Sequence, residues 1–368
     1  MSKFFRPSSP RLLIGLAVLL AAVLSSCSGG ALTGSSWPGV TLDGDTGYIA
    51  YASHVFAIDL PTGNELWRFP QEPDRDRTFY APPALAGNGL IIVGGYDDIV
   101  YALQPDGSRV DVAWTFEDSS DDIIAGPVVV DEMVLIPSSD GNLYALDINS
   151  GEPVWDQPFS ARAALWSTPV IDEDRIYLGS LDHYLYALDL SSGQIVWEID
   201  LGAAIADSPT LTNGYLIVGT FGQDVDAVDI ETGQVAWTFE AQDSVWGNPS
   251  VSGDVAFVGD VSGLVYAVNV EDGTEIWRQQ VDGAVAASPL ATDGVIYVVT
   301  EIGKVYPLDA SDGTILWNDV PNLEGRLLAD PFIFEDELLL PTLENAECLI
   351  FGVQLESSRT SCLFDLSS

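Results

Sequence analysis

Tryptophan recurs through this chain of 368 residues at a nearly constant interval. Seven of the ten tryptophans follow one another at spacings of 47, 41, 42, 40, 40 and 40 residues, and they are Trp67, Trp114, Trp155, Trp197, Trp237, Trp277 and Trp317. A fixed period of about 40 residues indicates a repeat architecture, in which each unit buries its apolar surface against its neighbours. The sequence therefore predicts a series of similar units rather than two or three independent domains.

Each of these tryptophans ends a recurring sequence motif, which we call the phrase. Its clearest copy is residues 185–197, which read Leu-Tyr-Ala-Leu-Asp-Leu-Ser-Ser-Gly-Gln-Ile-Val-Trp. A second marker is a proline that opens an apolar run, and it occurs at Pro38, Pro83, Pro127, Pro169, Pro209, Pro249, Pro289 and Pro331. The last proline has no matching tryptophan. In the C-terminal copy of the phrase, which begins at Ile350, Cys362 stands at the tryptophan position. The sequence predicts eight units, the last of them degenerate.

Each unit contains four short apolar runs separated by Gly, Asp, Ser and Asn, and in the fourth unit these are residues 169–171, 175–179, 185–190 and 195–199. Runs of this length without helical periodicity predict an all-antiparallel β protein. Four strands in each of eight units predict an eight-bladed β-propeller over residues 37–368. The pattern is compatible with a terminal strand that crosses to latch the ring and equally with its absence.

The phrase has a mechanical interpretation. Both faces of a blade pack on neighbouring blades, so its strands are apolar on both sides. Ala187 is small where a neighbouring ring approaches, Asp189 can accept hydrogen bonds in the turn, and Gly193 can adopt a positive φ. A tryptophan between blades would remove about 150–250 Å² from water, which corresponds to about 4–6 kcal/mol before opposing terms. We assign the seven periodic tryptophans a structural role.

The N-terminus has the features of a targeting segment. Lys3, Arg6 and Arg11 accompany an apolar run over residues 12–24, which is shorter than the roughly 20 residues that span a bilayer. The run ends in Leu-Ser-Ser-Cys27, which resembles a bacterial lipobox. We predict a signal peptide over residues 1–26, lipidation of Cys27 and a flexible tether over residues 27–36; a secretory signal with an incidental cysteine is the alternative. The protein would then be extracytoplasmic, anchored to the periplasmic face of the outer membrane or the outer face of the plasma membrane.

The charge balance excludes one class of partner. The chain has 55 Asp and Glu against 13 Lys and Arg, a formal net charge of −42, whereas nucleic-acid binding needs a basic face. A hydrophobic content of 47% argues against disorder. We expect an acidic, folded, monomeric propeller that does not bind nucleic acid.

The repeated Tyr-Ala-Leu-Asp, Gly and Trp resemble the tryptophan-docking motif of PQQ-type β-propellers over essentially all of residues 37–368. Eight blades behind a lipidated N-terminus are similar to the BamB family, the scaffold lipoproteins of the outer-membrane β-barrel assembly machine. The resemblance implies a non-enzymatic protein that binds envelope proteins, namely the POTRA domains of BamA where the host has an outer membrane. A propeller that binds glycans or cell-wall polymer is an alternative, and a PQQ-dependent dehydrogenase relative is another.

The residues argue against catalysis. Dehydrogenases of the superfamily carry an adjacent Cys-Cys pair, which this chain lacks. His54 and His183 are expected in turns between second and third strands, without a nucleophile or ligand set around them. The acidic runs at residues 43–45 and 118–122 lack the ligand spacing of a known calcium loop. We expect no catalytic residue, no cofactor and no metal.

Cys348 and Cys362 are the other two cysteines of the chain. In an oxidising compartment they would be expected to pair, and a hairpin of the eighth unit could bring them together. We predict a disulfide between Cys348 and Cys362 that stabilises the eighth blade, which has no docking tryptophan. Two buried free thiols are the alternative.

Trp37, Trp166 and Trp246 lie outside the periodic series, and the last two stand three residues before a blade-opening proline. The same position in other units holds Tyr80, Ile124, Ala206, Ala286 and Leu328. Arg162 and Arg326 fall in the same connectors, and aromatic residues with arginine are enriched at interaction hot spots. We predict a partner-binding face that includes Tyr80, Arg162, Trp166, Trp246, Arg326 and Leu328. Alternatively, these residues pack on neighbouring connectors and plug the centre of the ring.

Overall fold

The computed structural model describes residues 38–74, 76–292, 294–343 and 348–366. The chain divides into two compact units, residues 1–34 and 35–368, and the 31 strands found among the described residues belong to the second. The described residues contain no helix that could span a bilayer. The predicted signal peptide (1–26), Cys27, the tether (27–36) and Trp37 lie outside the described residues.

The strands form eight antiparallel sheets, each made of strands that are consecutive in the chain. The first four blades consist of β1 (Gly39–Asp43), β2 (Thr46–Tyr51), β3 (His54–Asp59) and β4 (Asn64–Phe69); β5 (Ala84–Leu85), β6 (Ile91–Gly94), β7 (Val100–Asp106) and β8 (Arg109–Phe116); β9 (Val128–Val130), β10 (Met133–Pro137), β11 (Asn142–Asp147) and β12 (Phe159–Ser160); and β13 (Val170–Asp172), β14 (Arg175–Gly179), β15 (Tyr184–Asp189) and β16 (Ile195–Asp200).

The last four blades consist of β17 (Thr210–Thr212), β18 (Tyr215–Gly219), β19 (Asp224–Asp229) and β20 (Val235–Glu240); β21 (Ser250–Ser252), β22 (Val255–Gly259), β23 (Leu264–Asn269) and β24 (Glu275–Gln280); β25 (Leu290–Thr292), β26 (Val295–Val299) and β27 (Val305–Asp309); and β28 (Phe332–Phe334), β29 (Glu337–Pro341), β30 (Ile350–Gln354) and β31 (Thr360–Phe364).

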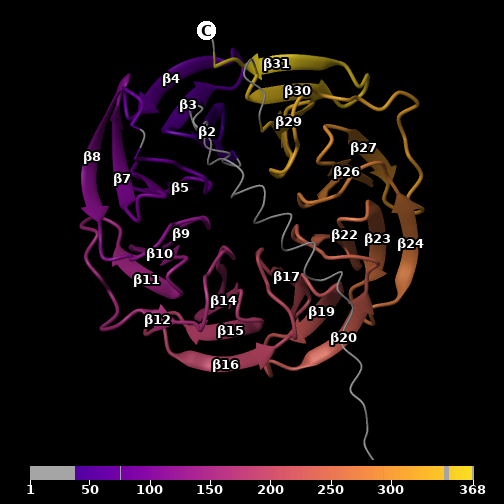
Figure 1. Cartoon of the computed structure of the whole chain (residues 1–368), viewed down its shortest axis with the longest axis horizontal. Helices are drawn as coiled ribbons and strands as arrows, with labels where there is room; N and C mark the ends of the chain where they lie inside the picture. The colour runs from indigo at the N-terminus through magenta and orange to yellow at the C-terminus, as the bar shows by residue number, and fades with distance from the viewer. Residues whose placement is uncertain (1–37, 75, 293, 344–347, 367–368) are drawn as a thin grey trace, which may run out of the picture. The chain divides into compact units, whose positions relative to one another are not determined.

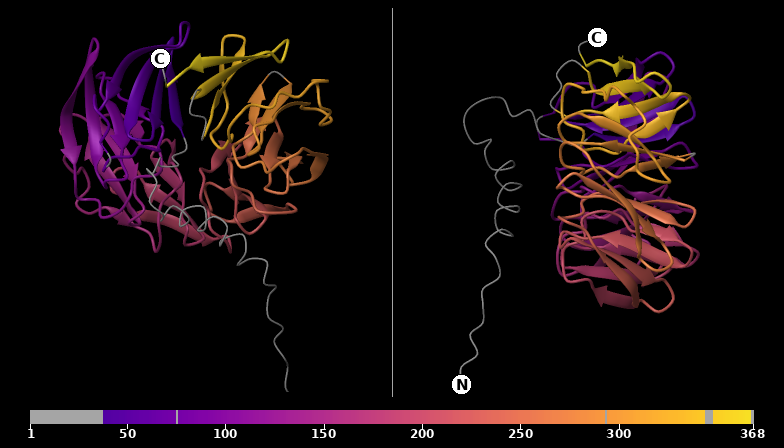
Figure 2. Two further views of the ribbon diagram at one scale, coloured as in Figure 1. Left: turned by 45° about the horizontal axis from the view of Figure 1, so that its top comes forward. Right: turned by 90° about the vertical axis from the view of Figure 1, so that its right-hand side faces the viewer.

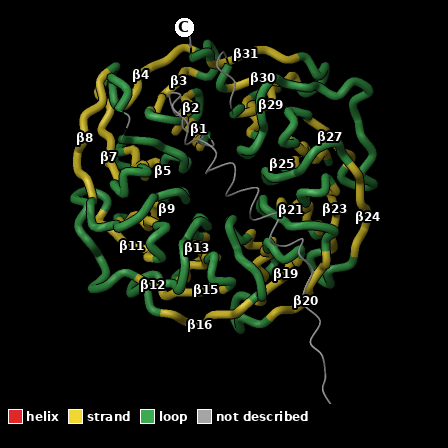
Figure 3. Tube along the Cα trace, in the orientation of Figure 1, coloured by secondary structure: helices red, strands yellow, loops and turns green. Residues whose placement is uncertain are grey.

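The eight blades follow one another around a common axis (Figure 1). The first strand of each blade lies nearest the axis, and the fourth strand of the four-stranded blades forms the rim (Figure 3). The blades together make a disc when seen from the side (Figure 2). The predicted eight-bladed, all-β propeller is confirmed.

The tryptophans join consecutive blades. Each indole N–H of five consecutive blades donates to a main-chain carbonyl of the next blade: Trp114 to Ile148 (3.0 Å), Trp155 to Leu190 (3.2 Å), Trp197 to Ile230 (2.9 Å), Trp237 to Val270 (2.8 Å) and Trp277 to Ala310 (2.9 Å). The same rings cover the turn glycines. At Gly193, where φ is 68°, an added Cβ would lie 2.6 Å from Cε3 of Trp155. A side chain there would suffer both an unfavourable backbone conformation and a clash with the indole.

The tryptophan also lies at a bulge. In blade four Ala187 pairs with Trp197 and Leu188 pairs with Ile195, which leaves Val196 without a partner. Blades one, two, five and six shift register at the same point. The side chains of Ile195 and Val196 are 48% and 44% exposed. The bulge that positions the tryptophan therefore explains why apolar residues are exposed on the rim.

Blades three and seven depart from four regular strands. In blade seven Pro307 replaces the alanine of the phrase and has no N–H to donate. The described part of the fourth segment forms no regular strand, and it pairs with β27 through a bridge between Leu308 and Ile315 and through hydrogen bonds that include Leu316 N to Pro307 O and Asp309 N to Thr314 O, both 2.8 Å. In blade three, Pro158 directly precedes the two-residue strand β12. Prolines thus interrupt two rim strands where the repeat pattern predicts continuous ones.

The ring closes where blade eight meets blade one, with β31 beside β4 in Figure 1. Each of these two sheets contains only its own four consecutive strands, so no described strand crosses the seam. Their contact is an apolar cluster that joins Val40, Ile49, Phe56, Ile58 and Leu60 to Leu339, Leu349, Ile350 and Phe364. The rings of Phe56 and Phe364 meet edge to face, 5.4 Å apart. Among the described residues, side-chain packing joins the two blades at this seam.

Cys362 does not take the place of a docking tryptophan. In blade eight the register shift falls between Ile350 and Phe351, two residues earlier along the third strand than in the regular blades. As a result, a Cβ added to Gly63 would meet the carbonyl oxygen of Leu363 at 2.0 Å, and the Cys362 side chain is exposed. Cys362 instead forms a disulfide with Cys348, with the two Cα atoms 5.8 Å apart. The bond joins the residue two before β30 to β31.

The carboxylate of Asp226 is buried in the core of blade five. Asp226 stands where the other copies of the phrase have tyrosine or phenylalanine, is 4% exposed and accepts a hydrogen bond from the Thr238 hydroxyl. Desolvation raises the pKa of Asp226 to about 6. In the folded state the carboxyl therefore holds its proton at pH values where the unfolded chain has released it.

Because the folded-state pKa of Asp226 is raised, stability is expected to fall as pH rises from about 4 to about 6. Asp226→Asn should increase the free energy of unfolding at pH 8 by about 1–2 kcal/mol and flatten this pH dependence. Urea unfolding at pH 4.5 and pH 8 would measure both effects. The exposed Asp254→Asn is the control, and an equal gain in both variants would contradict the buried-charge explanation.

Candidate partner-binding face

The connectors that enter the innermost strands alternate between buried and half-buried residues. A buried anchor comes first in seven connectors: Phe79, Ile123, Leu165, Ile205, Val245, Val285 and Leu327. The next residue is half-buried in every case, and these seven, which we call the connector ring, are Tyr80, Ile124, Trp166, Ala206, Trp246, Ala286 and Leu328. Since consecutive side chains of an extended backbone point in opposite directions, the connector ring points away from the core.

The connectors share one face of the disc with the turns between second and third strands. Main-chain N–H groups of those turns donate to the connectors at 2.9–3.1 Å: Ser139 to Asp122, Leu181 to Ala164, Phe221 to Ala204, Val261 to Ser244 and Glu301 to Ala284. Turns between first and second strands lie at the other end of the antiparallel strands, on the opposite face. The candidate face is thus built from two loops of each blade.

The aromatic members of the connector ring are held by neighbouring turns. The indole N–H of Trp166 donates to the Ser139 hydroxyl at 3.2 Å. The Trp246 ring lies 5.5 Å from that of Phe221, and the Tyr80 ring lies 3.9 Å from that of Tyr96. These contacts fix the orientation of the rings while leaving part of each exposed. The packing on neighbours that the alternative interpretation predicts is present, and the partner-binding role stays a prediction.

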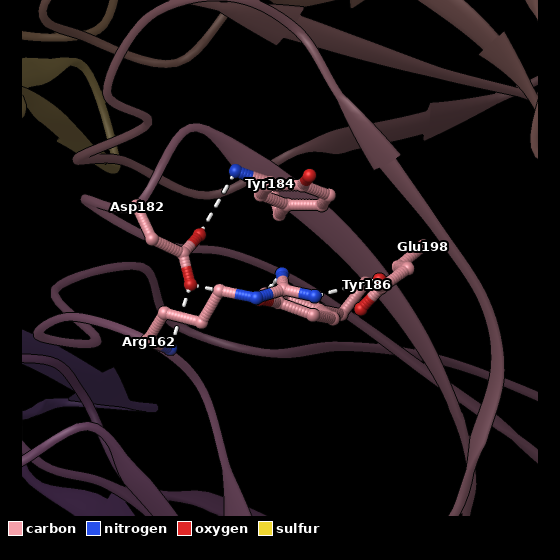
Figure 4. Close-up of polar contacts among 5 residues, drawn as sticks. All are labelled: Arg162, Asp182, Tyr184, Tyr186 and Glu198. Carbon is pink, nitrogen blue, oxygen red and sulfur yellow. Dashed lines mark hydrogen bonds and ion pairs between the residues drawn. The ribbon is translucent and has the colours of Figure 1, made fainter.

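Arg162 is engaged within blade four (Figure 4). Its guanidinium donates to the Tyr186 hydroxyl (2.9 Å) and to a Glu198 carboxylate oxygen (2.8 Å), and it lies 4.2 Å from the centre of the Tyr184 ring. Its main-chain N–H donates to Asp182 at 2.8 Å. The bond to Glu198 raises the pKa of the Arg162 guanidinium. Arg162 therefore holds Tyr186 and Glu198 together on this part of the face, and its positive charge is already paired with the Glu198 carboxylate.

Arg326 is also paired internally. Its guanidinium lies 3.5 Å from a Glu301 carboxylate oxygen of blade seven, and its main chain forms two hydrogen bonds with Leu343. Leu328, two residues later, remains half-buried on the same face. The structure thus brings the six predicted residues to one face. The charges of the two arginines are already paired with carboxylates of the same protein.

A group of three carboxylates lies on this face. Carboxylate oxygens of Asp98, Asp121 and Asp122 all lie within 4.8 Å of one another. Desolvation and the neighbouring carboxylates raise the pKa of Asp122 to about 6 and that of Asp98 as well. The sequence drew attention to residues 118–122 but not to Asp98, which comes from the turn between β6 and β7. The sequence feature that could have pointed to Asp98 is the run Tyr96-Asp97-Asp98 in that turn.

Both histidines lie at hairpins between second and third strands, on the same face as the connectors. His183 occupies an exposed turn with a φ of 80°. The prediction that His54 lies in a turn is wrong, because His54 begins β3 and pairs with Tyr51 across the hairpin. Its ring nitrogen Nδ1 lies 3.1 Å from the Ser53 hydroxyl, and desolvation lowers the pKa of His54.

Comparisons with known proteins agree with this architecture. The family model described as outer membrane protein assembly factor BamB matches residues 51–165, 139–245 and 222–342. No curated protein sequence matches the chain. The crystal structure of BamB from Moraxella catarrhalis is similar with a TM-score of 0.67 at 20% identity, covering 82% of this chain and 90% of that one. The computationally designed Ika8 protein is similar with a TM-score of 0.71 at 14% identity, covering 84% and 94%. At these identities the structural likeness shows the fold alone.

Proposed function

Because the chain belongs to the BamB family of outer membrane protein assembly factors, we propose that it is a non-enzymatic scaffold that binds other envelope proteins through the connector ring. The observation that carries this proposal is the pair Trp166 and Trp246, half-buried and held in place by Ser139 and Phe221. Tryptophan supplies a large contact area, and side chains fixed before binding lose little freedom on association.

We further propose that Cys27 carries a lipid anchor after removal of residues 1–26, so that the propeller is tethered at a membrane surface. In a host with an outer membrane, the partner would be a BamA-like protein that presents POTRA domains. The lipobox-like sequence before Cys27 supports the anchor, and the family membership supports the partner.

Glycan binding is the second candidate, since exposed aromatic rings can stack on sugars. Stacking needs an open ring face, whereas the Tyr80 and Trp246 rings already pack on Tyr96 and Phe221. The arrangement therefore favours a protein partner that contacts ring edges and the loops around them.

The double variant Trp166→Ala, Trp246→Ala is expected to reduce recovery of partner proteins at least about tenfold, as loss of two interface tryptophans typically does. The measurement is affinity purification of the tagged, full-length protein from its own membrane, with partners quantified by mass spectrometry. Val154→Ala with Ile276→Ala is the matched control, because both residues are exposed on the rim. Unchanged recovery with a folded double variant would refute the connector ring as the binding site.

A further inference from the structure

The charges around the connector ring are unbalanced. The described connectors and second-to-third-strand turns contain four cations, and each has an internal carboxylate partner: Arg77 with Asp74 (3.4 Å), Arg162 with Glu198 (2.8 Å), Lys304 with Asp282 (2.6 Å) and Arg326 with Glu301 (3.5 Å). Other carboxylates of the same loops form no ion pair with a described residue, and these include Asp98, Asp118, Asp121, Asp122 and Asp243. Among the described residues, the face thus presents aromatic and apolar side chains together with more negative than positive charge.

The aromatic residues and the surplus carboxylates are contiguous over blades two to four. Trp166 donates to Ser139, whose main-chain N–H donates to the carbonyl of Asp122 at 2.9 Å. The Asp122 carboxylate clusters with Asp98 and Asp121. Asp98 stands two residues after Tyr96, whose ring contacts Tyr80. We call Tyr80, Tyr96, Asp98, Asp121, Asp122 and Trp166 the acidic arc.

Crowded carboxylates beside aromatic rings favour one kind of ligand. Desolvation and, after it, repulsion between the clustered carboxylates raise the pKa of Asp98 and of Asp122, and a cation placed among these carboxylates would oppose that repulsion. Guanidinium and ammonium groups form charge-assisted hydrogen bonds with carboxylates and are attracted to aromatic rings. An acidic surface would be repelled, and like-charge contacts oppose association.

We propose that the acidic arc binds lysine and arginine side chains of a basic segment of the protein partner. This inference rests on the proposed scaffold function and adds the chemistry of the partner. The aromatic residues would contact the aliphatic stems and the carboxylates would contact the charged ends. Binding would therefore be sensitive to salt, because the carboxylates are at the surface.

Two synthetic peptides of equal length test the proposal: one with lysine and arginine among leucines, and one with glutamate at every basic position. Fluorescence anisotropy with the full-length protein in detergent should show binding of the basic peptide only, weakened at least about fivefold between 50 mM and 300 mM NaCl. The triple variant Asp98→Asn, Asp121→Asn, Asp122→Asn should weaken that binding at least about tenfold.

The matched control carries Asp131→Asn, Asp172→Asn and Asp254→Asn, which remove the same charge from first-to-second-strand hairpins on the opposite face. Equal weakening in the two triple variants would overturn the proposal, because net charge alone would then explain binding. If the acidic-arc variant fails to fold, the single exposed change Asp121→Asn replaces it, with at least a twofold loss expected. Absence of peptide binding, while envelope proteins still co-purify with the wild type, would overturn the partner chemistry and leave the scaffold function intact.

Discussion

Replacing Trp237 with alanine is expected to lower the free energy of unfolding by about 3–5 kcal/mol, the usual cost of removing a buried aromatic side chain. The ring is 9% exposed within a cluster that includes Val225 and Val268. Its N–H donates to Val270 O at 2.8 Å, and its face covers Gly273 of the next blade. The substitution would leave a cavity between two blades and a buried carbonyl without its donor, which adds to the loss.

Urea unfolding followed by far-ultraviolet circular dichroism would measure this effect, and hydrogen exchange would locate it at β20 and β23. Trp317→Ala is the matched control. Trp317 holds the same position in the phrase but is only half-buried, and its indole forms no hydrogen bond with a described residue. Equal losses for the two variants would mean that the tryptophans do not act through the contact between blades.

The repeat made the propeller predictable because each contact between blades is encoded within about one period. A tryptophan, the glycine that it covers and the carbonyl that it reaches are at most about 40 residues apart, as Trp197, Gly233 and Ile230 show. Any copy of the phrase therefore predicts the next contact. Pro307 and Pro158 are visible in the sequence, yet their effect depends on whether the N–H they remove would have faced a neighbouring strand.

The candidate site was predictable only in part. The sequence placed Trp166 and Trp246 in equivalent connectors, and the structure puts them on one face. It could not show that Arg162 donates to Tyr186 and Glu198, because those partners depend on which side of β15 and β16 faces the connector. Asp98 was missed for a similar reason: its approach to Asp122 depends on how one blade's turn packs against the next connector.

The closing seam shows where local pattern fails. Counting residues from the turn puts Cys362 at the tryptophan position, but the register shift between Ile350 and Phe351 brings Leu363 against Gly63 instead. A bulge can move along a strand without a change in sequence length. Blade eight thus meets blade one without an indole, and the phenylalanine pair Phe56 and Phe364 fills part of that role.

Removing the disulfide, with Cys348→Ser and Cys362→Ser together, is expected to lower the free energy of unfolding by about 3 kcal/mol. The two cysteines are 14 residues apart in the sequence, and closing a loop of about 15 residues restricts the unfolded chain by roughly this amount. The effect should concentrate at the seam, because the bond holds β31 while Phe364 packs against blade one.

Thermal unfolding with and without reductant measures the contribution, and non-reducing mass spectrometry should show the oxidised protein 2 Da lighter than its reduced form. Hydrogen exchange in the double variant should rise in β30, β31 and β3 and stay unchanged in β15. The double variant is its own control for the reductant, which should leave its transition temperature unaltered. A wild-type transition that reductant does not move would show that the ring stays closed through side-chain packing alone, with blade eight held by the apolar cluster around Leu339 and Ile350.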